Sequence, residues 1–193
     1  MASRMANLWR AVLPTLVLLA APSLAGACKR SNHARVTTYV PPPIPAGFGE
    51  QTGSEWRIAT PSTWREVQKK GEAVWALADP QAVDDFHANV SVVTEAFADE
   101  SYEYARASEA ALRRDVRCTA TSTREDVIDG DPTLIIESRL APQPPSTVPY
   151  RVMLTALSSR GTGYVVACAV SASAFERYRT TCESILHSFA VQR

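Results

Sequence analysis

The stretch YVVACAVSASAFERYRTTCESILHSF, residues 164–189, decides the fold of this chain. Residues 164–170 are apolar at successive positions, which predicts a central strand that is covered on both faces. From residue 175 onward, apolar residues recur at spacings of three and four, as in an amphipathic helix. Ser173 and Glu176 have the spacing of a capping box at its start. A buried strand that leads directly into such a helix predicts a sheet with a helix folded back upon it.

The residues before this stretch predict further strands and one more helix. Strands are predicted from alternating or β-rich composition over 55–60, 73–78, 89–97, 123–128, 133–140 and 150–157. Asp129-Gly130 separates two of them and is a strong signal for a hairpin turn. Residues 101–116 carry an apolar stripe and predict a helix, with Ser101 as its cap. Runs of strands with two principal helices indicate an α+β domain with a mostly antiparallel sheet.

Residues 1–27 have the parts of an export signal peptide. Arg4 and Arg10 form a positive region without acidic residues, and an apolar run, AVLPTLVLLAA, occupies 11–21. That run is shorter than the roughly 20 apolar residues that a membrane-spanning helix needs. Small residues follow and end at a cysteine. We therefore expect cleavage between Ala27 and Cys28.

Residues 24–28, LAGAC, resemble the lipobox of bacterial lipoproteins. In that family the cysteine thiol is acylated and the cysteine becomes the new N-terminus, so the resemblance implies a lipid anchor, such as palmitate, on Cys28. The family usually has leucine three residues before the cysteine, whereas this chain has Ala25 there and Leu24 one residue earlier. Residues 25–27 also fit an ordinary A-x-A cleavage site, which would secrete the protein, and an uncleaved anchor is a third alternative.

The expected location is the cell envelope, with the domain in the periplasm or at the cell surface. Lys29, after the cysteine, is not the aspartate that retains lipoproteins in the inner membrane, which favours the outer membrane. Residues 28–52 predict a lipidated N-terminus and a proline-rich tether, because Pro41-Pro42-Pro43 favours an extended semi-rigid spacer. Proline-rich segments also dock into aromatic grooves. The folded domain is expected over residues 53–193.

The balance of charge argues against a nucleic-acid partner. The chain has 20 basic and 20 acidic residues. Removing the first 27 residues deletes Arg4 and Arg10 and leaves a net charge of about −2, too small for electrostatic steering. The expected partners are the membrane, through acylated Cys28, and an unidentified envelope protein.

The order of motifs over residues 53–193 resembles the PsbP-like (DcrB-like) domain of small bacterial lipoproteins. The motifs are Trp56, Pro61 and Trp64 in and after the opening strand, Asn89-Val90-Ser91-Val92, Ser101 to Leu112, Asp129-Gly130, Gly163-Tyr164-Val165-Val166, and the closing Ile185-Leu186-His187-Ser188-Phe189. This resemblance implies an αβα sandwich that is used mainly in binding or accessory roles and has no shared catalytic site.

Three cysteines remain for an oxidising compartment once Cys28 is acylated. Cys168 lies roughly 10 Å from the end of its strand, and Cys182 lies roughly 13 Å along the next helix. If the helix folds back, the two lie at the same height, and we expect a Cys168–Cys182 disulfide worth roughly 3 kcal/mol. Small neighbours, Ala167 and Ala169, would permit the close approach. The alternatives are two buried thiols or a pairing through Cys118, which is otherwise left as a buried thiol, a free thiol or an intermolecular link.

No catalytic, metal or cofactor site is predicted. The histidines (His33, His87 and His187) are far apart, the cysteine spacings fit no zinc pattern, and no nucleophile motif is present. His187 fits the negative end of a helix dipole, and His87 is interpreted as a loop residue. Eight aromatic residues would either pack the core or line an apolar groove: Trp56, Trp64, Trp75, Phe97, Tyr102, Tyr104, Tyr150 and Tyr164. The expected function is a non-enzymatic accessory or protein-interaction domain; the alternative is a carrier of a small apolar ligand or lipid.

Overall fold

The computed structural model of the chain describes residues 34–68, 73–142 and 147–192. Seven antiparallel strands form the main sheet: β3 (Arg65–Glu66), β4 (Ala73–Val83), β5 (Phe86–Ala96), β6 (Cys118–Ile128), β7 (Asp131–Leu140), β8 (Tyr150–Ser159) and β9 (Thr162–Ser171). Their spatial order is β3-β4-β5-β9-β8-β7-β6. A smaller antiparallel sheet has the order β1-β2-β10, with strands β1 (Phe48–Thr52), β2 (Trp56–Pro61) and β10 (Ala190–Val191).

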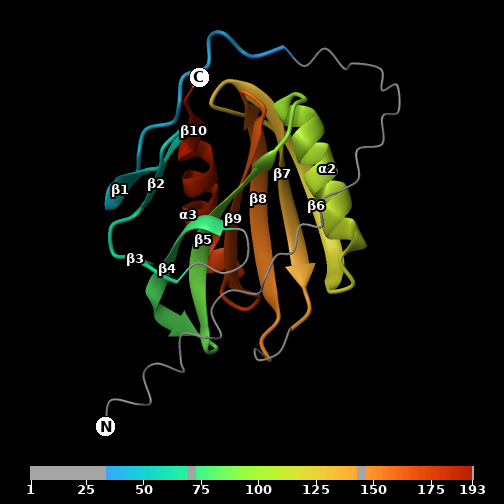
Figure 1. Cartoon of the computed structure of the whole chain (residues 1–193). Coiled ribbons are helices and arrows are strands. Elements are labelled where there is room, and N and C mark those ends of the chain that lie inside the picture. The colour runs from blue at the N-terminus through green and yellow to red at the C-terminus, as the bar shows by residue number, and fades with distance from the viewer. Residues whose placement is uncertain (1–33, 69–72, 143–146, 193) are drawn as a thin grey trace.

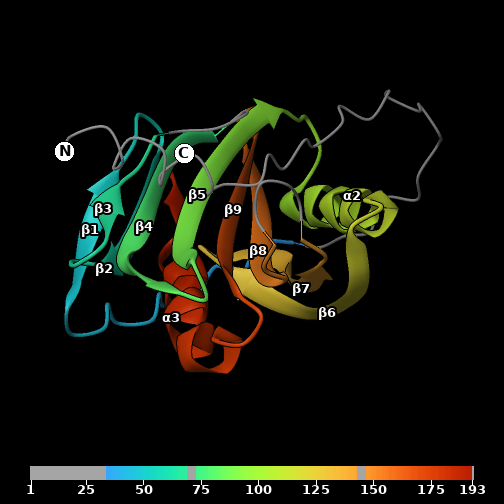
Figure 2. The same ribbon diagram turned by 90° about the horizontal axis from the view of Figure 1, so that it is seen from below.

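The main sheet lies between two helices, α2 (Ser101–Arg114) and α3 (Phe175–Ser188). Helix α2 packs on β6, β7 and β8, whereas α3 packs on β8 and β9 from the other face and also contacts β2 (Figures 1 and 2). The expected α+β sandwich with an antiparallel sheet is therefore confirmed.

Strand β9 is buried on both faces, as its sequence predicts. Val166, Cys168 and Val170 belong to the core under α3, whereas Val165 and Ala167 belong to the core under α2. A strand that packs on both faces has no room for polar side chains, which explains its nearly continuous apolar run.

Three two-residue turns connect neighbouring strands of the main sheet. They are Asp84-Asp85, Asp129-Gly130 and Arg160-Gly161, and all six residues have φ between 52° and 81°. Positive φ at both turn positions is the type I′ geometry that matches the twist of a hairpin. The Asp129-Gly130 turn is confirmed. The Asp84-Asp85 turn places His87 inside β5, so its interpretation as a loop residue is wrong.

Both expected helix caps are wrong. Helix α2 begins after Glu100 and α3 begins after Ala174, and neither start has a side-chain cap. The Ser101 hydroxyl donates to Asp131 Oδ2 at 2.8 Å, and Ser173 donates to Asp84. The Ser101 side chain therefore links the start of α2 to β7, and the Ser173 side chain links the residues just before α3 to the Asp84-Asp85 turn.

The N-terminal boundary of the domain also needs correction. Residues 48–52, assigned to the tether, form strand β1, and all five pair with β2. The sequence FGEQT has no apolar alternation because the strand lies at an edge and is only partly covered. Strand β4 likewise continues past Asp79-Pro80 to Val83, with an irregular register between Ala78 and Ala82 that accommodates the proline.

Most of the aromatic residues pack the two cores. Trp56, Trp64 and Tyr164 are at most 5% exposed and belong to the core under α3. Tyr104, a residue of α2, and Tyr150 on β8 are 2% exposed and belong to the core between α2 and the sheet. Burial raises the pKa of Tyr150 to about 12, and the charge of Arg117 opposes this shift. Trp75 is partly buried and lines a cavity beside β2.

Candidate functional site

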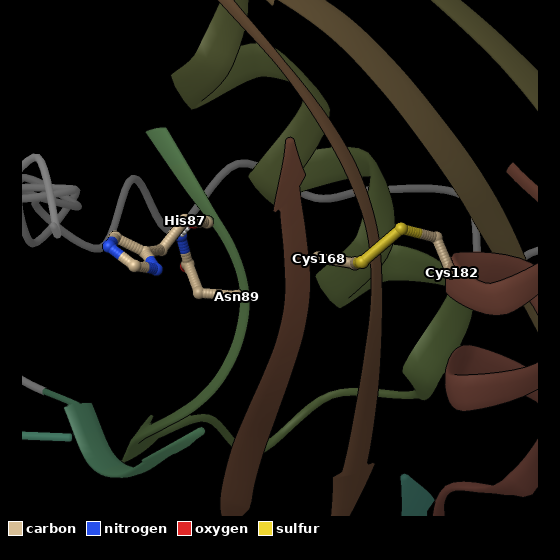
Figure 3. The surroundings of a disulfide bond; sticks show 4 residues. All are labelled: His87, Asn89, Cys168 and Cys182. Atoms are coloured by element: carbon tan, nitrogen blue, oxygen red, sulfur yellow. Dashed lines mark hydrogen bonds between the residues drawn. A yellow bond between two sulfur atoms is a disulfide. The ribbon is translucent and has the colours of Figure 1, made fainter. Parts of the chain in front are cut away.

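The expected disulfide joins Cys168 on β9 to Cys182 on α3. The two Cα atoms are 5.6 Å apart, and both residues are fully buried in the core under α3. In Figure 3 the bond crosses from the strand to the helix, and His87 and Asn89 lie on the neighbouring strand β5. Since buried disulfides resist exchange, we interpret this bond as a structural cross-link between β9 and α3.

The prediction that Ala167 and Ala169 permit the close approach of α3 to β9 is wrong. Ala167 and Ala169 belong to the core under α2, on the opposite face from the disulfide. They do not set the distance between β9 and α3. The helix is close because the two facing positions themselves carry the small cysteine side chains.

The predicted lipidation and cleavage residues, Ala27 and Cys28, lie outside the described residues. From residue 34 onward the tether can be followed, and it contacts the domain. Arg35 donates from Nη2 to the carbonyl oxygen of Asp129 at 2.8 Å, and the Val36 amide donates to the Gly130 oxygen at 2.7 Å. The described part of the tether is therefore docked on the β6–β7 turn.

Glycine at position 130 makes this docking possible. A Cβ atom there would lie 3.0 Å from Arg35 Nε and 3.1 Å from the Val36 oxygen, and φ of Gly130 is 81°. The same turn contacts other parts of the chain, because Asp129 Oδ2 accepts from the Val191 amide at 3.3 Å. The Asp129-Gly130 turn thus contacts both the tether and strand β10.

A cavity of about 630 Å³ lies between the docked tether and the domain, and we call it the tether cavity. Its walls are Arg35, Val36, Thr37, Tyr39, Pro41, Pro42 and Ile44 from the tether, with Glu50, Arg57, Asp129, His187, Ser188, Phe189 and Ala190 from the domain. A second hollow, of about 200 Å³, continues between the proline run and α3. The volume of the tether cavity lies within the roughly 300–1,000 Å³ of typical ligand sites.

Charged groups surround the end of α3 beside this cavity. His187 Nδ1 lies 2.9 Å from the Glu183 oxygen, and its Nε2 lies 3.1 Å from Asp126 Oδ2. Arg124 bridges the same two acidic residues, at 3.5 Å from Asp126 and 3.1 Å from Glu183. His187 therefore holds the end of α3 to β6, which agrees with its expected place at a helix C-terminus.

Tyr39 gives the tether an aromatic contact with the domain. Burial raises the pKa of its phenol, and the negative charge of Asp129 adds to this shift. The sequence alone does not predict this contact, because Tyr39 and Asp129 are far apart in the chain and no local pattern connects them.

The arrangement at the end of α3 does not form a hydrolase triad. Ser188, beside His187 in sequence, donates to the Ile185 oxygen at 2.7 Å and accepts from the Ala59 amide at 2.8 Å. The hydroxyl thus fastens α3 to β2. Within residues 34–68, 73–142 and 147–192, no three His, Cys, Asp or Glu side chains are grouped to hold a metal.

Comparison with solved structures identifies the fold. LpqN of Mycobacterium tuberculosis, a protein involved in cell envelope biogenesis, matches 74% of this chain and 87% of its own, with a TM-score of 0.55 and 11% identity. The Ran-binding protein Mog1p of Saccharomyces cerevisiae matches 75% of this chain and 96% of its own, with a TM-score of 0.51 and 10% identity. The chain shares the α+β fold of these two proteins.

PsbP (CyanoP) of Synechocystis sp. PCC 6803 is also similar, over 86% of this chain and 98% of its own, with a TM-score of 0.49 and 14% identity. No family model and no curated protein sequence matches the chain. In the described part of the chain, no helix has the length and apolar character to cross a membrane.

Proposed function

We propose that this chain is an envelope lipoprotein, anchored through Cys28, whose domain is a non-enzymatic accessory or protein-interaction module. The position of Cys28 carries the proposal. It follows an export signal, and it stands six residues before Ala34, where the described chain begins beside its docking turn. An acyl group on Cys28 would therefore be separated from the docked part of the chain by only a few residues. More than one acyl chain makes such an anchor stable.

The shared fold supports the second half of the proposal. LpqN takes part in cell envelope biogenesis, and Mog1p binds the protein Ran. By analogy, the tether cavity is the surface we assign to a partner, because it combines apolar and charged walls, as the centre and rim of interfaces do.

Replacing Cys28 by Ala tests the anchor. We expect C28A to lose incorporation of an alkyne-labelled fatty acid completely and to leave the membrane fraction. The matched control is C118A, which removes the free cysteine of the described chain and should keep both labelling and membrane attachment. Labelling of C28A at the wild-type level would contradict the lipoprotein assignment.

Photo-cross-linking in intact cells tests the interaction surface. A cross-linking amino acid at Ile44, which is 50% exposed and lines the tether cavity, should yield one reproducible protein adduct. The control position is Val116, which is 99% exposed after α2. Equal adducts from both positions, or none from Ile44, would remove the tether cavity as the partner surface.

The alternative function is a carrier of a small apolar ligand or lipid, and the volume of the tether cavity favours it. A carrier should retain its ligand through purification, so native mass spectrometry of the full chain would show an added mass. Returning that ligand should raise the Tm, since a ligand that binds only the folded state stabilises it.

A further inference from the structure

A second cavity, of about 270 Å³, lies where strand β2 and its preceding loop meet β4, β5 and β9, and we call it the Trp cavity. The residues that matter here are Gly53, Glu55, Trp56, Trp75 and Tyr164. Its volume is just below the roughly 300–1,000 Å³ of sites for drug-sized ligands, so it suits a small chemical group.

Aromatic rings form one side of this cavity. The rings of Trp56 and Trp75 are 5.2 Å apart at an angle of 60°, and Tyr164 lies beside Phe189 with centroids 6.2 Å apart. Gly53 lies directly against Trp56, since an added Cβ would be 2.3 Å from the indole ring. The glycine therefore fixes the position of the indole without filling the space. Aromatic faces carry partial negative charge and attract cations.

A single carboxylate completes the lining. Glu55 accepts a hydrogen bond from the Tyr164 hydroxyl at 3.0 Å. In the described parts of the chain, Glu55 forms no ion pair, and the walls contain no Lys or Arg. The hydroxyl side chains of Thr94 and Thr162 add further polar groups. The cavity is thus negative and partly aromatic.

These features discriminate between classes of ligand. An anion would be repelled by Glu55, and a purely apolar ligand would remove water from the exposed Glu55 carboxylate without offering it an opposite charge. A metal ion would find one carboxylate and too few oxygen ligands around it. An organic ammonium satisfies both walls, because its charge pairs with Glu55 while its carbon atoms contact the indole rings.

We propose that the Trp cavity binds an organic ammonium group. The group can be carried by a free small molecule or by the head of a lipid, and both present the same chemistry. Arg160 acts on Tyr164 through its charge but is not part of the cavity walls. Because the walls contain one carboxylate, the site would take one ammonium group.

Choline chloride is the first probe, added to the full chain in detergent that lacks an ammonium group while tryptophan fluorescence is followed. We expect saturable quenching by choline and little by 3,3-dimethyl-1-butanol, a neutral molecule of the same shape. Glu55→Gln should weaken choline binding about tenfold, or about 1.4 kcal/mol, because the variant loses the negative charge that pairs with the ammonium group. The matched control, Glu66→Gln, alters an exposed carboxylate on β3 outside the cavity and should bind as wild type.

A short-chain phosphatidylcholine, used below its micelle concentration, distinguishes the two sources. Binding of choline alone assigns a free amine, and preference for the phospholipid assigns a lipid head; both support the proposal. Equal quenching by choline and its neutral analogue, equal affinity of E55Q and E66Q, or quenching by neither choline nor the phospholipid would overturn it. Circular dichroism of E55Q confirms that the variant is folded, so a loss of binding is attributable to the site.

Discussion

The two faces of the main sheet hold their helices by different means. Helix α3 is joined to β9 by a disulfide and to β2 through Ser188, and its N-terminal half carries an ion-pair network. Helix α2 has no covalent link and rests on packed side chains and a few hydrogen bonds, such as Tyr104 to Glu95 at 2.6 Å. Helix α3 is therefore held to the sheet more firmly than α2, and we expect α2 to unfold locally before α3 does.

The ion pairs on the α3 face show how this rigidity extends to the surface. Arg151 pairs with Glu137 and with Glu176, and Arg179 pairs with the same two acidic residues. Both arginines also lie over the ring of Phe175, at 3.8 and 4.8 Å from its centroid. Side-chain hydrogen bonds from Arg179 hold the pKa of Glu176 below its ordinary value.

The largest expected effect comes from removing the disulfide. The double variant Cys168→Ala with Cys182→Ala should lower the free energy of unfolding by about 3 kcal/mol, because the unfolded chain regains the entropy of the closed loop. Urea unfolding without reductant measures this loss, and C118A serves as the control with unchanged stability. Hydrogen exchange should then show α3 amides opening as readily as those of α2. If α3 stayed the slower helix in the double variant, the disulfide would not be the source of the difference.

The next largest effect is expected on the α2 face, where Tyr150 should make the free energy of unfolding depend on pH. Tyr150 has a folded pKa of about 12 against an ordinary value near 10, so the folded state retains a proton that the unfolded state loses. The stabilising contribution of the neutral phenol is complete below pH 10 and is lost as pH rises from 10 to 12, by up to about 2–3 kcal/mol. Tyr150→Phe should flatten the curve of unfolding free energy over this range. A curve identical to that of wild type would show that other groups cause the alkaline loss.

A smaller effect is expected at the start of α2. Ser101 donates to Asp131 at 2.8 Å and accepts from the Ser158 amide at 2.9 Å, within a buried site. Ser101→Ala should cost about 1–3 kcal/mol, because it leaves a carboxylate and an amide without this partner. The control is Ser108→Ala, whose hydroxyl bonds only to the Tyr104 carbonyl of the same helix. Equal Tm values for the two variants would mean that Ser101 does not hold α2 to the sheet.

Much of the fold could be predicted because its signals are local. The periodicity of α3, the apolar run of β9 and the Asp129-Gly130 turn each follow from residues close together in sequence. The disulfide could also be predicted, since strand and helix rises place its two cysteines at one height.

What the sequence could not reveal depends on contacts between distant segments. Strand β1 has no apolar pattern of its own and is defined by its pairing with β2. The docking of Arg35 on Asp129 spans 94 residues, and the Trp cavity joins Glu55 to Tyr164 across 109. Ser101 and Ser173 have the residue type and spacing of helix caps, but their hydroxyls bond to Asp131 and Asp84 on other elements, and no local pattern records those partners.

The docked tether also limits how far the domain can reach from a membrane. A free extended tether from Cys28 to residue 47, just before β1, would span roughly 63–68 Å, but docking at Arg35 leaves seven residues, or about 25 Å. With Cys28 acylated as proposed, the end bearing the Asp129-Gly130 and Arg160-Gly161 turns would face the bilayer, and the Asp84-Asp85 turn would face away. Thr162 follows the Arg160-Gly161 turn and lines the Trp cavity, so in that orientation the cavity would also lie toward the lipid heads. The short free part of the tether would thus orient the domain relative to the membrane as well as retain it there.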